Sequence, residues 1–559
     1  MFHCKVISAL DKVFADGCYD DYSTIKKVTA LKGERVAFQI VCLIDYAPDS
    51  GFGRKFTVSI DGEAAKYTTV RQVRHVPALF TKRSIIDEDF IKLTPGLVPD
   101  VLTPLEYDGC PVLMPDCPLA LRFDVEIPED CDLPEGSTLT VHFNSIPREG
   151  SNLPVFDGEC SVELEVIDAV LPEQKLLFTQ WFHSDCLANY YRVEKWSDEH
   201  FEICERFART AKKNGFKMIL TPLISPPLDN AYDTRDLQLA IITATPEGYA
   251  FDWSRLGRWI DMCDRVGIEL FEIGHLFTQG GATCATKVSG YVDGEYTRLF
   301  EKDTPCDDPE YTKFLRAMLT SFLDYMKARG DDKRCYFHIS DEPPLEHLET
   351  YTRAKSSIGD LLEDYVIMDA LSHHEFYESG AVKKPIVLLN HLDNFISHGV
   401  KELWTYNCCA PDHGYSNRFL GMSLARNRSI CLLLYKYHIE GFLHWGYNFY
   451  NNSGSCNAIN PFLDTSSGGY FPAGDAFSVY PGDDCTPLES LRLVSFTEAL
   501  QDLRAMQLCE HLYSETEVVS ALENALGKEI MTNTYVNDSA AYTAIRDVIN
   551  SMIKAKISK

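Results

Sequence analysis

The chain has 559 residues, of which 45% are hydrophobic and 12% are aromatic, and its formal net charge at pH 7 is -29. This length exceeds what one hydrophobic core can organise, so two or three domains are expected. The strong negative charge disfavours nucleic acid and an anionic membrane surface as partners, because both require a basic footprint. No apolar run approaches the length of a membrane span, so we expect no membrane segment.

The cysteines and the N-terminus bear on the cellular compartment. The 19 cysteines are odd in number and include no C-x-x-C pair, so neither a disulfide framework nor a zinc ribbon is indicated. The stretch MFHCKVISALDKVFADGCYDD has no charged segment followed by an uninterrupted apolar run, which predicts that a signal peptide is absent. We therefore expect a reduced, cytoplasmic protein, with secretion by a signal-independent route as the alternative.

Residues 1–170 are expected to form an N-terminal β-sandwich. Short stretches of alternating apolar and polar residues are separated there by Gly, Pro, Asp and Asn turn signals, the pattern of an antiparallel sandwich. The clearest stretches are residues 34–45, 55–60, 119–128, 137–146 and 160–171. The segment LPEQK, residues 171–175, is the predicted junction with the next domain.

From residue 171 to residue 515 the pattern changes to alternating strands and helices, which predicts an α/β domain. Strands are expected within residues 176–185, 216–223, 268–277, 335–340, 365–371, 385–390, 402–407 and 441–450. Eight strand–helix units favour a (β/α)8 barrel. A doubly wound sheet would alternate similarly, but no Gly-rich turn follows the first strand. Residues 516–559 are expected to form a short C-terminal helical appendage.

Polar and aromatic side chains gather at the ends of the predicted strands, where the active sites of barrels form. They are His183 and Asp185 after the first strand, Glu272 and His275 on the third, Asp341 and Glu342 on the fourth, Asp369 on the fifth, Tyr406 and Asn407 on the seventh, and Trp445, Tyr447 and Asn448 on the eighth. Each alone reads more simply as a loop residue or a helix cap. Together they supply the aromatic faces, carboxylates and amides that carbohydrate sites need. No metal-binding, P-loop, serine-hydrolase or kinase motif is present, so we expect no metal and no cofactor.

The stretch CYFHISDEPP, residues 335–344, ends a predicted strand in two adjacent carboxylates, Asp341 and Glu342. Capping of the next helix is the simpler interpretation, since carboxylates suit a helix N-terminus. In a two-carboxylate glycosidase the acids flank the sugar, about 5–5.5 Å apart for retention or roughly 6.5–9.5 Å for inversion. Adjacent residues reach the sugar from one side. If both act in catalysis, the nucleophile must come from elsewhere, as when the 2-acetamido oxygen of the substrate attacks.

Four segments together resemble glycoside hydrolase family 123. They are HISDEP at residues 338–343, GFLHWGYNFY at 441–450, FPAGDAFSVYPG at 471–482, and the helix that begins SLRL at Ser490. The resemblance implies a β-sandwich followed by a (β/α)8 barrel, and the activity of a retaining β-N-acetylgalactosaminidase. It also implies that Asp341 orients the acetamido group and that Glu342 is the general acid and base.

We therefore expect an exo-acting, retaining glycosidase that removes β-linked N-acetylgalactosamine from a glycan or oligosaccharide by substrate assistance. The expected substrate-binding residues are His183, Asp185, Glu272, His275, His338, Tyr406, Trp445, Tyr447, Asn448 and Asp475, the last from the long loop 451–485. Trp445 is expected to form the floor under the sugar ring, and Tyr406 to donate to the acetamido carbonyl. Two alternatives stay open: a glycosidase of other specificity with a nucleophile such as Glu272, and a non-catalytic carbohydrate-binding protein.

Overall fold

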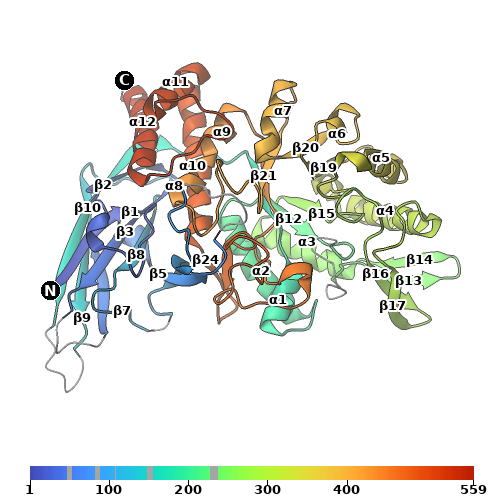
Figure 1. The fold of residues 1–559 in the computed structure, drawn as a ribbon, viewed down its shortest axis with the longest axis horizontal. Coiled ribbons are helices and arrows are strands. Elements are labelled where there is room, and N and C mark those ends of the chain that lie inside the picture. Colours follow the sequence, from blue (N-terminus) through green and yellow to red (C-terminus); the bar gives the residue numbers. More distant parts are fainter. Residues whose placement is uncertain (47–52, 82–88, 108, 148–154, 227–236, 559) are drawn as a thin grey trace.

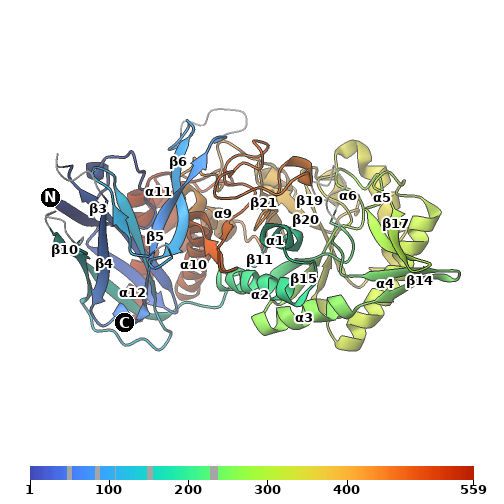
Figure 2. The same ribbon diagram turned by 90° about the horizontal axis from the view of Figure 1, so that it is seen from below.

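The computed structural model describes residues 1–46, 53–81, 89–107, 109–147, 155–226 and 237–558. An N-terminal β-domain and a larger α/β domain lie side by side along the long axis of the molecule (Figure 1; Figure 2). None of the helices in this described part combines the length and apolar character that crossing a bilayer requires.

The N-terminal domain is a sandwich of two five-stranded sheets, as the alternating pattern predicts. One sheet has the order β1 (Phe2–Ser8), β3 (Arg35–Ile44), β8 (Leu119–Glu126), β5 (Thr68–Ala78), β6 (Gly96–Pro104). The other has the order β2 (Lys27–Lys32), β10 (Asp157–Val170), β9 (Ser137–Ser145), β4 (Arg54–Asp61), β7 (Val112–Leu113). Inward-facing aromatics fill the space between them; the rings of Phe38 and Phe123 stack at 4.9 Å between centroids.

The second domain is a nearly closed barrel of eight parallel strands, and the predicted (β/α)8 barrel is confirmed. Its strands are β11 (Leu177–Gln180), β12 (Met218–Thr221), β15 (Leu270–Ile273), β18 (Cys335–Phe337), β19 (Val366–Leu371), β20 (Lys384–Leu388), β21 (Trp404–Asn407) and β22 (Gly441–His444). Neighbours follow chain order, and β22 pairs with β11. At the remaining seam the Lys217 N–H donates to the Phe178 carbonyl over 3.0 Å.

Large side chains fill the barrel interior, so the barrel is a packed core with its ligand site at the mouth. Trp404 of β21 shows how closely the interior is packed, because its ring lies over Gly441 of the paired strand β22. A Cβ atom at Gly441 would lie 2.0 Å from the Trp404 ring. Only glycine fits this position, and a larger residue there would displace the strand that leads to Trp445.

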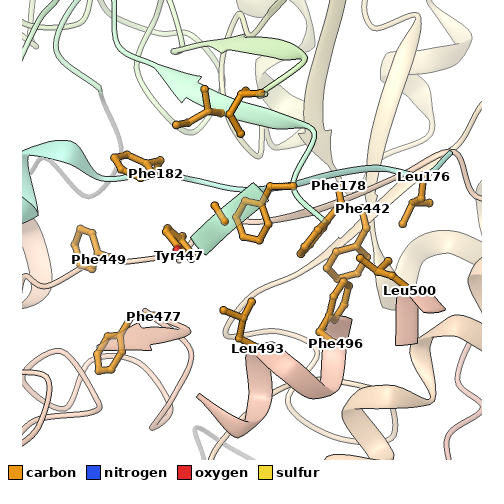
Figure 3. Packing of buried hydrophobic residues seen from close by; sticks show 14 of the residues in the cluster. Leu176, Phe178, Phe182, Phe442, Tyr447, Phe449, Phe477, Leu493, Phe496 and Leu500 are labelled. Atoms are coloured by element: carbon orange, nitrogen blue, oxygen red, sulfur yellow. The ribbon is translucent and has the colours of Figure 1, made fainter. Parts of the chain in front are cut away.

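Helices cover the outside of the barrel. They are α1 (Ser184–Tyr191), α2 (Asp198–Lys213), α3 (Ser254–Val266), α4 (Pro309–Arg329), α5 (Leu348–Ser356), α6 (Glu375–Glu378), α7 (Leu392–Ser397), α8 (Leu424–Arg428), α9 (Ile430–Lys436) and α10 (Leu491–Leu512). The long helix α10 buries an apolar stripe on β11 and β22, where Phe496 packs at 4.8 Å from the ring of Phe178 and 4.8 Å from that of Phe442 (Figure 3).

A small four-stranded sheet extends the barrel on the side away from the sandwich (Figure 1). It consists of β14 (Gly248–Asp252), β13 (Ile241–Thr245), β16 (Val288–Val292) and β17 (Glu295–Phe300), in that order. The two hairpins come from the connections after β12 and β15. The sequence pattern did not predict them, because they lie inside the connections between barrel strands and outside the strand–helix alternation.

Buried ion pairs join the sandwich to the barrel. Asp100 of β6 accepts from Arg492 of α10 over 2.8 Å, and both side chains are almost completely buried. Arg122 of β8 pairs in the same way with Glu498 of α10. The C-terminal helices α11 (Glu515–Leu526) and α12 (Ser539–Ile557) extend this contact, since α12 packs against α10 and against β2 and β10. The two domains therefore share one buried interface.

The sandwich also supports the long loop that follows β22, which includes the short strands β23 (Val479–Pro481) and β24 (Pro487–Glu489). The Thr465 hydroxyl donates to the Pro77 carbonyl over 2.7 Å, and the Ala473 N–H donates to the Phe80 carbonyl over 2.6 Å. These bonds fix the part of the loop that lies next to the barrel mouth.

Candidate active site

A cavity of about 240 Å³ opens at the carboxyl ends of the barrel strands. It is lined by Trp181, His183, Gln279, Asp341, Glu342, Ala370, Tyr406, Cys408, Cys409, Leu443, Trp445, Phe449, Tyr470 and Phe471. Hollows of about 380 and 790 Å³ lie between the sandwich and the barrel. We place the site in the smaller cavity, because it has aromatic faces, convergent polar groups and the position where barrel active sites form.

Asp341 and Glu342 both reach this cavity because the backbone changes direction between them. In a regular strand, consecutive side chains point to opposite faces. Glu342 adopts a left-handed φ of 45°, which breaks that alternation just after β18. A non-glycine residue in this region costs of order 1–3 kcal/mol and marks a conformation that its surroundings enforce. Asp341 is 4% exposed, whereas Glu342 is exposed.

Neighbours on both sides hold the two carboxylates. The Gln279 side-chain amide donates to Asp341 Oδ2 over 2.8 Å, and the Glu342 N–H donates to the Ala370 carbonyl over 3.0 Å. The Tyr406 hydroxyl donates to Glu342 Oε1 over 2.6 Å. Burial and the charge of Glu342 raise the pKa of Tyr406 well above its ordinary value. Tyr406 therefore stays protonated and acts as a hydrogen-bond donor.

Asp341 is a buried carboxyl beside a second carboxyl. Burial, and then the charge of Glu342, raise the pKa of Asp341 well above its ordinary value, while nearby His338 and the Gln279 amide oppose that rise. The negative charge of Asp341 is therefore poorly compensated by the protein alone. An N–H donor or a cation that enters the cavity would gain strongly from contact with this carboxylate.

Beneath the two carboxylates lies a buried charge network centred on His338. Its Nε2 lies 2.8 Å from Glu272 Oε1 and its Nδ1 lies 3.1 Å from Asp369 Oδ1, and all three side chains are fully buried. Burial alone would lower the pKa of His338, but the hydrogen bonds with Asp369 and Glu272 raise it to about 10. His338 is therefore an imidazolium that donates from both ring nitrogens.

Asp369 connects this network to the segment that leads into Asp341 and Glu342. It accepts the backbone N–H of Ile339 over 3.0 Å and that of Ser340 over 3.4 Å, and it also accepts the hydroxyl of Tyr351. Burial raises the pKa of Asp369, whereas His338 and Tyr351 act in the opposite direction. We take Asp369 as ionised, because every one of these partners donates to it. The network thus fixes the two residues that precede Asp341.

A second interpretation of this region is a metal site, because His275 lies next to His338 and Asp369. In the described part of the chain, possible ligand atoms of His275, His338 and Asp369 lie within 4.8 Å of one another. However, both nitrogens of His338 are protonated and directed at carboxylates, so neither offers a lone pair to a metal. We therefore interpret the cluster as a hydrogen-bonded charge network.

Aromatic rings form another part of the cavity wall. Trp445 lies 4.7 Å from the ring of Phe471 and 5.1 Å from that of Phe449, between centroids. The Trp445 indole N–H donates to Asp475 Oδ2 over 3.1 Å, which fixes the orientation of the ring. Such faces suit the C–H surface of a sugar ring, while the carboxylates suit its polar groups.

The structure separates the sequence-predicted residues into two groups. Asp341, Glu342, His183, Tyr406 and Trp445 line the cavity. The others lie behind its wall: Asp185, Glu272, His275, His338, Tyr447, Asn448 and Asp475.

Several residues of the second group support residues of the first. The Asn448 side chain makes two hydrogen bonds with the backbone of His183. Its Oδ1 accepts from the His183 N–H over 2.9 Å, and its Nδ2 donates to the His183 carbonyl over 3.1 Å. Tyr447 is fully buried, and its hydroxyl donates to the Phe207 carbonyl over 2.9 Å. The expected substrate contacts of Tyr447 and Asn448 are therefore replaced by structural roles.

Other residues that the sequence did not single out also line the cavity: Trp181, Gln279, Cys408, Cys409, Phe449, Tyr470 and Phe471. The two cysteines directly follow the predicted strand 402–407, and Trp181 lies within the predicted range 176–185, directly after β11, so their positions in the sequence carried a usable signal. Gln279, Tyr470 and Phe471 come from long loops, whose course no periodicity reveals.

Comparisons with known proteins agree with this geometry. The family model described as "Glycoside hydrolase 123, catalytic domain" matches residues 181–509. A family 123 glycoside hydrolase from Clostridium perfringens, studied for glycolipid glycan hydrolysis, has a TM-score of 0.75 and 15% identity, with 100% of this chain and 99% of that chain covered. No curated protein sequence matches the chain.

Two further solved structures are much less similar. A putative β-galactosidase from Bacteroides fragilis has a TM-score of 0.30 and 10% identity, with 80% of this chain and 56% of that chain covered. A β-glucuronidase from Bifidobacterium dentium has a TM-score of 0.33 and 9% identity, with 90% and 66% covered. Similarity this low carries no argument about function.

Proposed function

Because the chain belongs to glycoside hydrolase family 123 and is therefore a glycosidase, we propose that it removes a terminal β-linked N-acetylgalactosamine from a glycan by substrate-assisted catalysis. The observation that carries this proposal is the arrangement of acids in the cavity. Among the described residues, Asp341 and Glu342 are the carboxylates that line it, and they follow one another at the end of a single strand. Neither is placed to attack the sugar from the face opposite the other.

The nucleophile that fits this arrangement is the acetamido oxygen of the substrate. Glu342 protonates the glycosidic oxygen as the amide oxygen attacks the anomeric carbon, and the bond to the aglycone breaks. Asp341 accepts the amide N–H and compensates the positive charge of the cyclic oxazolinium intermediate. Glu342 then takes a proton from a water molecule as the water oxygen attacks the anomeric carbon, and this attack opens the oxazolinium ring. Two displacements at the anomeric carbon give overall retention.

The environment of Asp341 supports this role. Its pKa is raised by burial and by Glu342, so an N–H donor that later becomes positively charged supplies the compensation that the protein leaves incomplete. The interaction grows as charge develops, and an interaction that is stronger in the transition state than in the ground state accelerates the reaction.

Glu272 is poorly placed to act as a nucleophile in its stead. It is fully buried, and it accepts from the Thr179 hydroxyl over 2.7 Å, from the Trp181 indole over 2.6 Å and from His338. An attack by Glu272 would have to break all three contacts and pass the Trp181 ring. This geometry favours the substrate amide over a carboxylate from another strand.

The size and lining of the cavity support a single terminal sugar as the bound unit. About 240 Å³ between Trp181, Trp445 and Phe471 suits one sugar ring better than an extended chain. N-acetylgalactosamine is our choice among 2-acetamido sugars because of the family resemblance. The test compares the hydrolysis rates of an aryl β-N-acetylgalactosaminide and the corresponding β-N-acetylglucosaminide. We expect the galactosaminide to be hydrolysed faster, and faster turnover of the glucosaminide would make N-acetylglucosamine the preferred sugar.

The mechanism is tested by comparing an aryl 2-acetamido glycoside with its 2-hydroxy counterpart. We expect turnover of the first only, with the β-anomer as the first product seen by NMR. A 2-fluoro sugar should label no carboxylate of the protein. Equal turnover of the 2-hydroxy sugar, or a covalent adduct on a carboxylate, would contradict the proposed mechanism.

A further inference from the structure

Two adjacent cysteines, Cys408 and Cys409, lie on the cavity wall directly after β21. Both are half-buried and reduced. In an extended strand their side chains would point to opposite faces. Here the chain turns at once, since the Cys408 N–H donates to the carbonyl of Ala410 over 2.8 Å. Both thiols therefore reach the same cavity.

The two thiols also contact each other. The Cys409 thiol is a hydrogen-bond partner of the Cys408 thiol, and the charge of Glu342 acts on Cys408. The Ala410 N–H lies 3.4 Å from Cys408 Sγ and donates to it. Two sulfur atoms that are held together at a cavity wall can bond to one soft centre at the same time.

We propose that Cys408 and Cys409 form a dithiol site that binds trivalent organoarsenicals and related thiophiles that take two thiols at once, and that occupation of this site blocks the substrate cavity. The existence of the site is independent of the glycosidase reaction, whereas the expected inhibition rests on the proposed function.

The reaction balances without an oxidant. An arsenoxide loses its oxygen as water, which takes up the two thiol protons, while two S–As bonds form and two S–H bonds break. Arsenic stays trivalent and the sulfur atoms keep their oxidation state. An excess of a small dithiol reverses the step by exchange, because it offers arsenic the same two-sulfur chelate.

Inhibition follows from the position of the adduct. Cys408 is two residues from Tyr406, whose hydroxyl holds Glu342 over 2.6 Å. A phenylarsenic group on both sulfur atoms would project into a cavity of about 240 Å³ that must also admit the sugar. Substrate binding and the Tyr406–Glu342 contact would both be lost.

The sandwich provides a matched control. Cys4 of β1 and Cys160 of β10 come from the two different sheets of the N-terminal domain, and their sulfur atoms lie within 3.1 Å of each other. This pair can also take an arsenical, but it lies far from the barrel mouth (Figure 1). Binding there should leave the hydrolytic activity unchanged.

The test uses phenylarsine oxide on the full chain, with the adduct located by mass spectrometry of peptides and the activity measured on an aryl glycoside that the enzyme hydrolyses. In the Cys4→Ser variant we expect an adduct bridging Cys408 and Cys409, near-complete loss of activity, and recovery with excess 2,3-dimercaptopropanol. Cys408→Ser and Cys409→Ser should each lose the bridged adduct and resist the reagent.

Two outcomes would overturn the proposal. One is the absence of a bridged adduct at Cys408 and Cys409 in Cys4→Ser. The other is full activity of a chain that carries the adduct, which would show that the thiols do not control the cavity. Because the adduct is detected by mass, a failure of the proposed glycosidase mechanism would leave the first result readable.

Discussion

Replacement of His338 by glutamine removes the buried cation between Glu272 and Asp369. Glutamine keeps a similar length and can still donate to one of them, but it carries no charge. The two carboxylates would then remain in the barrel interior without the group that balances them. We expect a large loss of stability of the barrel and a displaced Asp341–Glu342 turn, since Asp369 holds the N–H groups of Ile339 and Ser340.

The size of the effect follows from the pKa of His338. It rises from an ordinary value of 6.5 to about 10, and at about 1.36 kcal/mol per pKa unit this corresponds to about 5 kcal/mol of stabilisation by the charged form. Removing one partner of a buried ion pair costs about 3–5 kcal/mol in general. The two figures agree, so we expect the free energy of unfolding to fall by about 3–5 kcal/mol.

The raised pKa of His338 also determines how its contribution to stability changes with pH. A pKa that is raised on folding stabilises the protein fully below the unfolded value of 6.5, and the contribution disappears as the pH rises through about 10. The difference in the free energy of unfolding between the wild type and His338→Gln should therefore be largest below about pH 6.5 and shrink as the pH rises toward 10. If the variant does not fold, the wild type alone should lose stability across the same range.

Urea unfolding followed by tryptophan fluorescence measures the free energy of unfolding of the barrel domain, because all six tryptophans lie between residues 181 and 445. His275→Gln is the matched control. His275 stacks on His338 at 4.4 Å and is equally buried, but burial and the charge of His338 keep its pKa well below the ordinary value. His275→Gln should lower the free energy of unfolding by less than His338→Gln does, and it should leave the pH dependence of that free energy as in the wild type. Equal losses for both variants, or a wild-type advantage constant through pH 10, would refute the reasoning.

Three further predictions concern the chemistry. Glu342→Gln should lose about 10²–10⁴-fold activity on substrates with poor leaving groups and less on activated aryl glycosides, because the latter need little proton donation; an equal loss on both would exclude Glu342 as the acid. Asp341→Asn should lower kcat by on the order of 10²-fold or more with little change in KM, since its charge acts on the transition state; a change confined to KM would assign Asp341 to ground-state binding. Exhaustive treatment with EDTA should leave the activity intact, because both nitrogens of His338 in the His275–His338–Asp369 cluster are engaged with carboxylates; loss that a specific divalent ion restores would show a metal requirement.

The eight barrel strands and the Asp341–Glu342 turn could be predicted from the sequence because both have local signals. Strand periodicity located the strands, and two acids followed by two prolines marked the turn that follows β18, although β18 itself ends at Phe337, before the predicted end of the strand at residue 340. The same periodicity indicates which face of a strand a side chain occupies but not its depth. Glu272 and His338 indeed face the barrel interior, but they lie below the cavity and bind each other.

The loop residues of the site depend on contacts between distant parts of the chain. Phe471 reaches the cavity because the sandwich holds its loop through Pro77 and Phe80. Gln279 reaches Asp341 because the segment after β15 continues alongside β18, where the Phe277 N–H donates to the Ile339 carbonyl over 3.0 Å. Neither contact has a signature in the nearby sequence.

The central claim is that the amide oxygen of the substrate is the nucleophile, and a series of aryl glycosides with progressively fluorinated N-acetyl groups tests it most directly. Each fluorine withdraws electrons from the amide and weakens its oxygen as a nucleophile, while the leaving group and the size of the sugar barely change. If the amide oxygen attacks, kcat should fall steeply and regularly from the acetyl to the trifluoroacetyl compound. A kcat that stays the same along the series would show that the amide takes no part and that the nucleophile belongs to the protein.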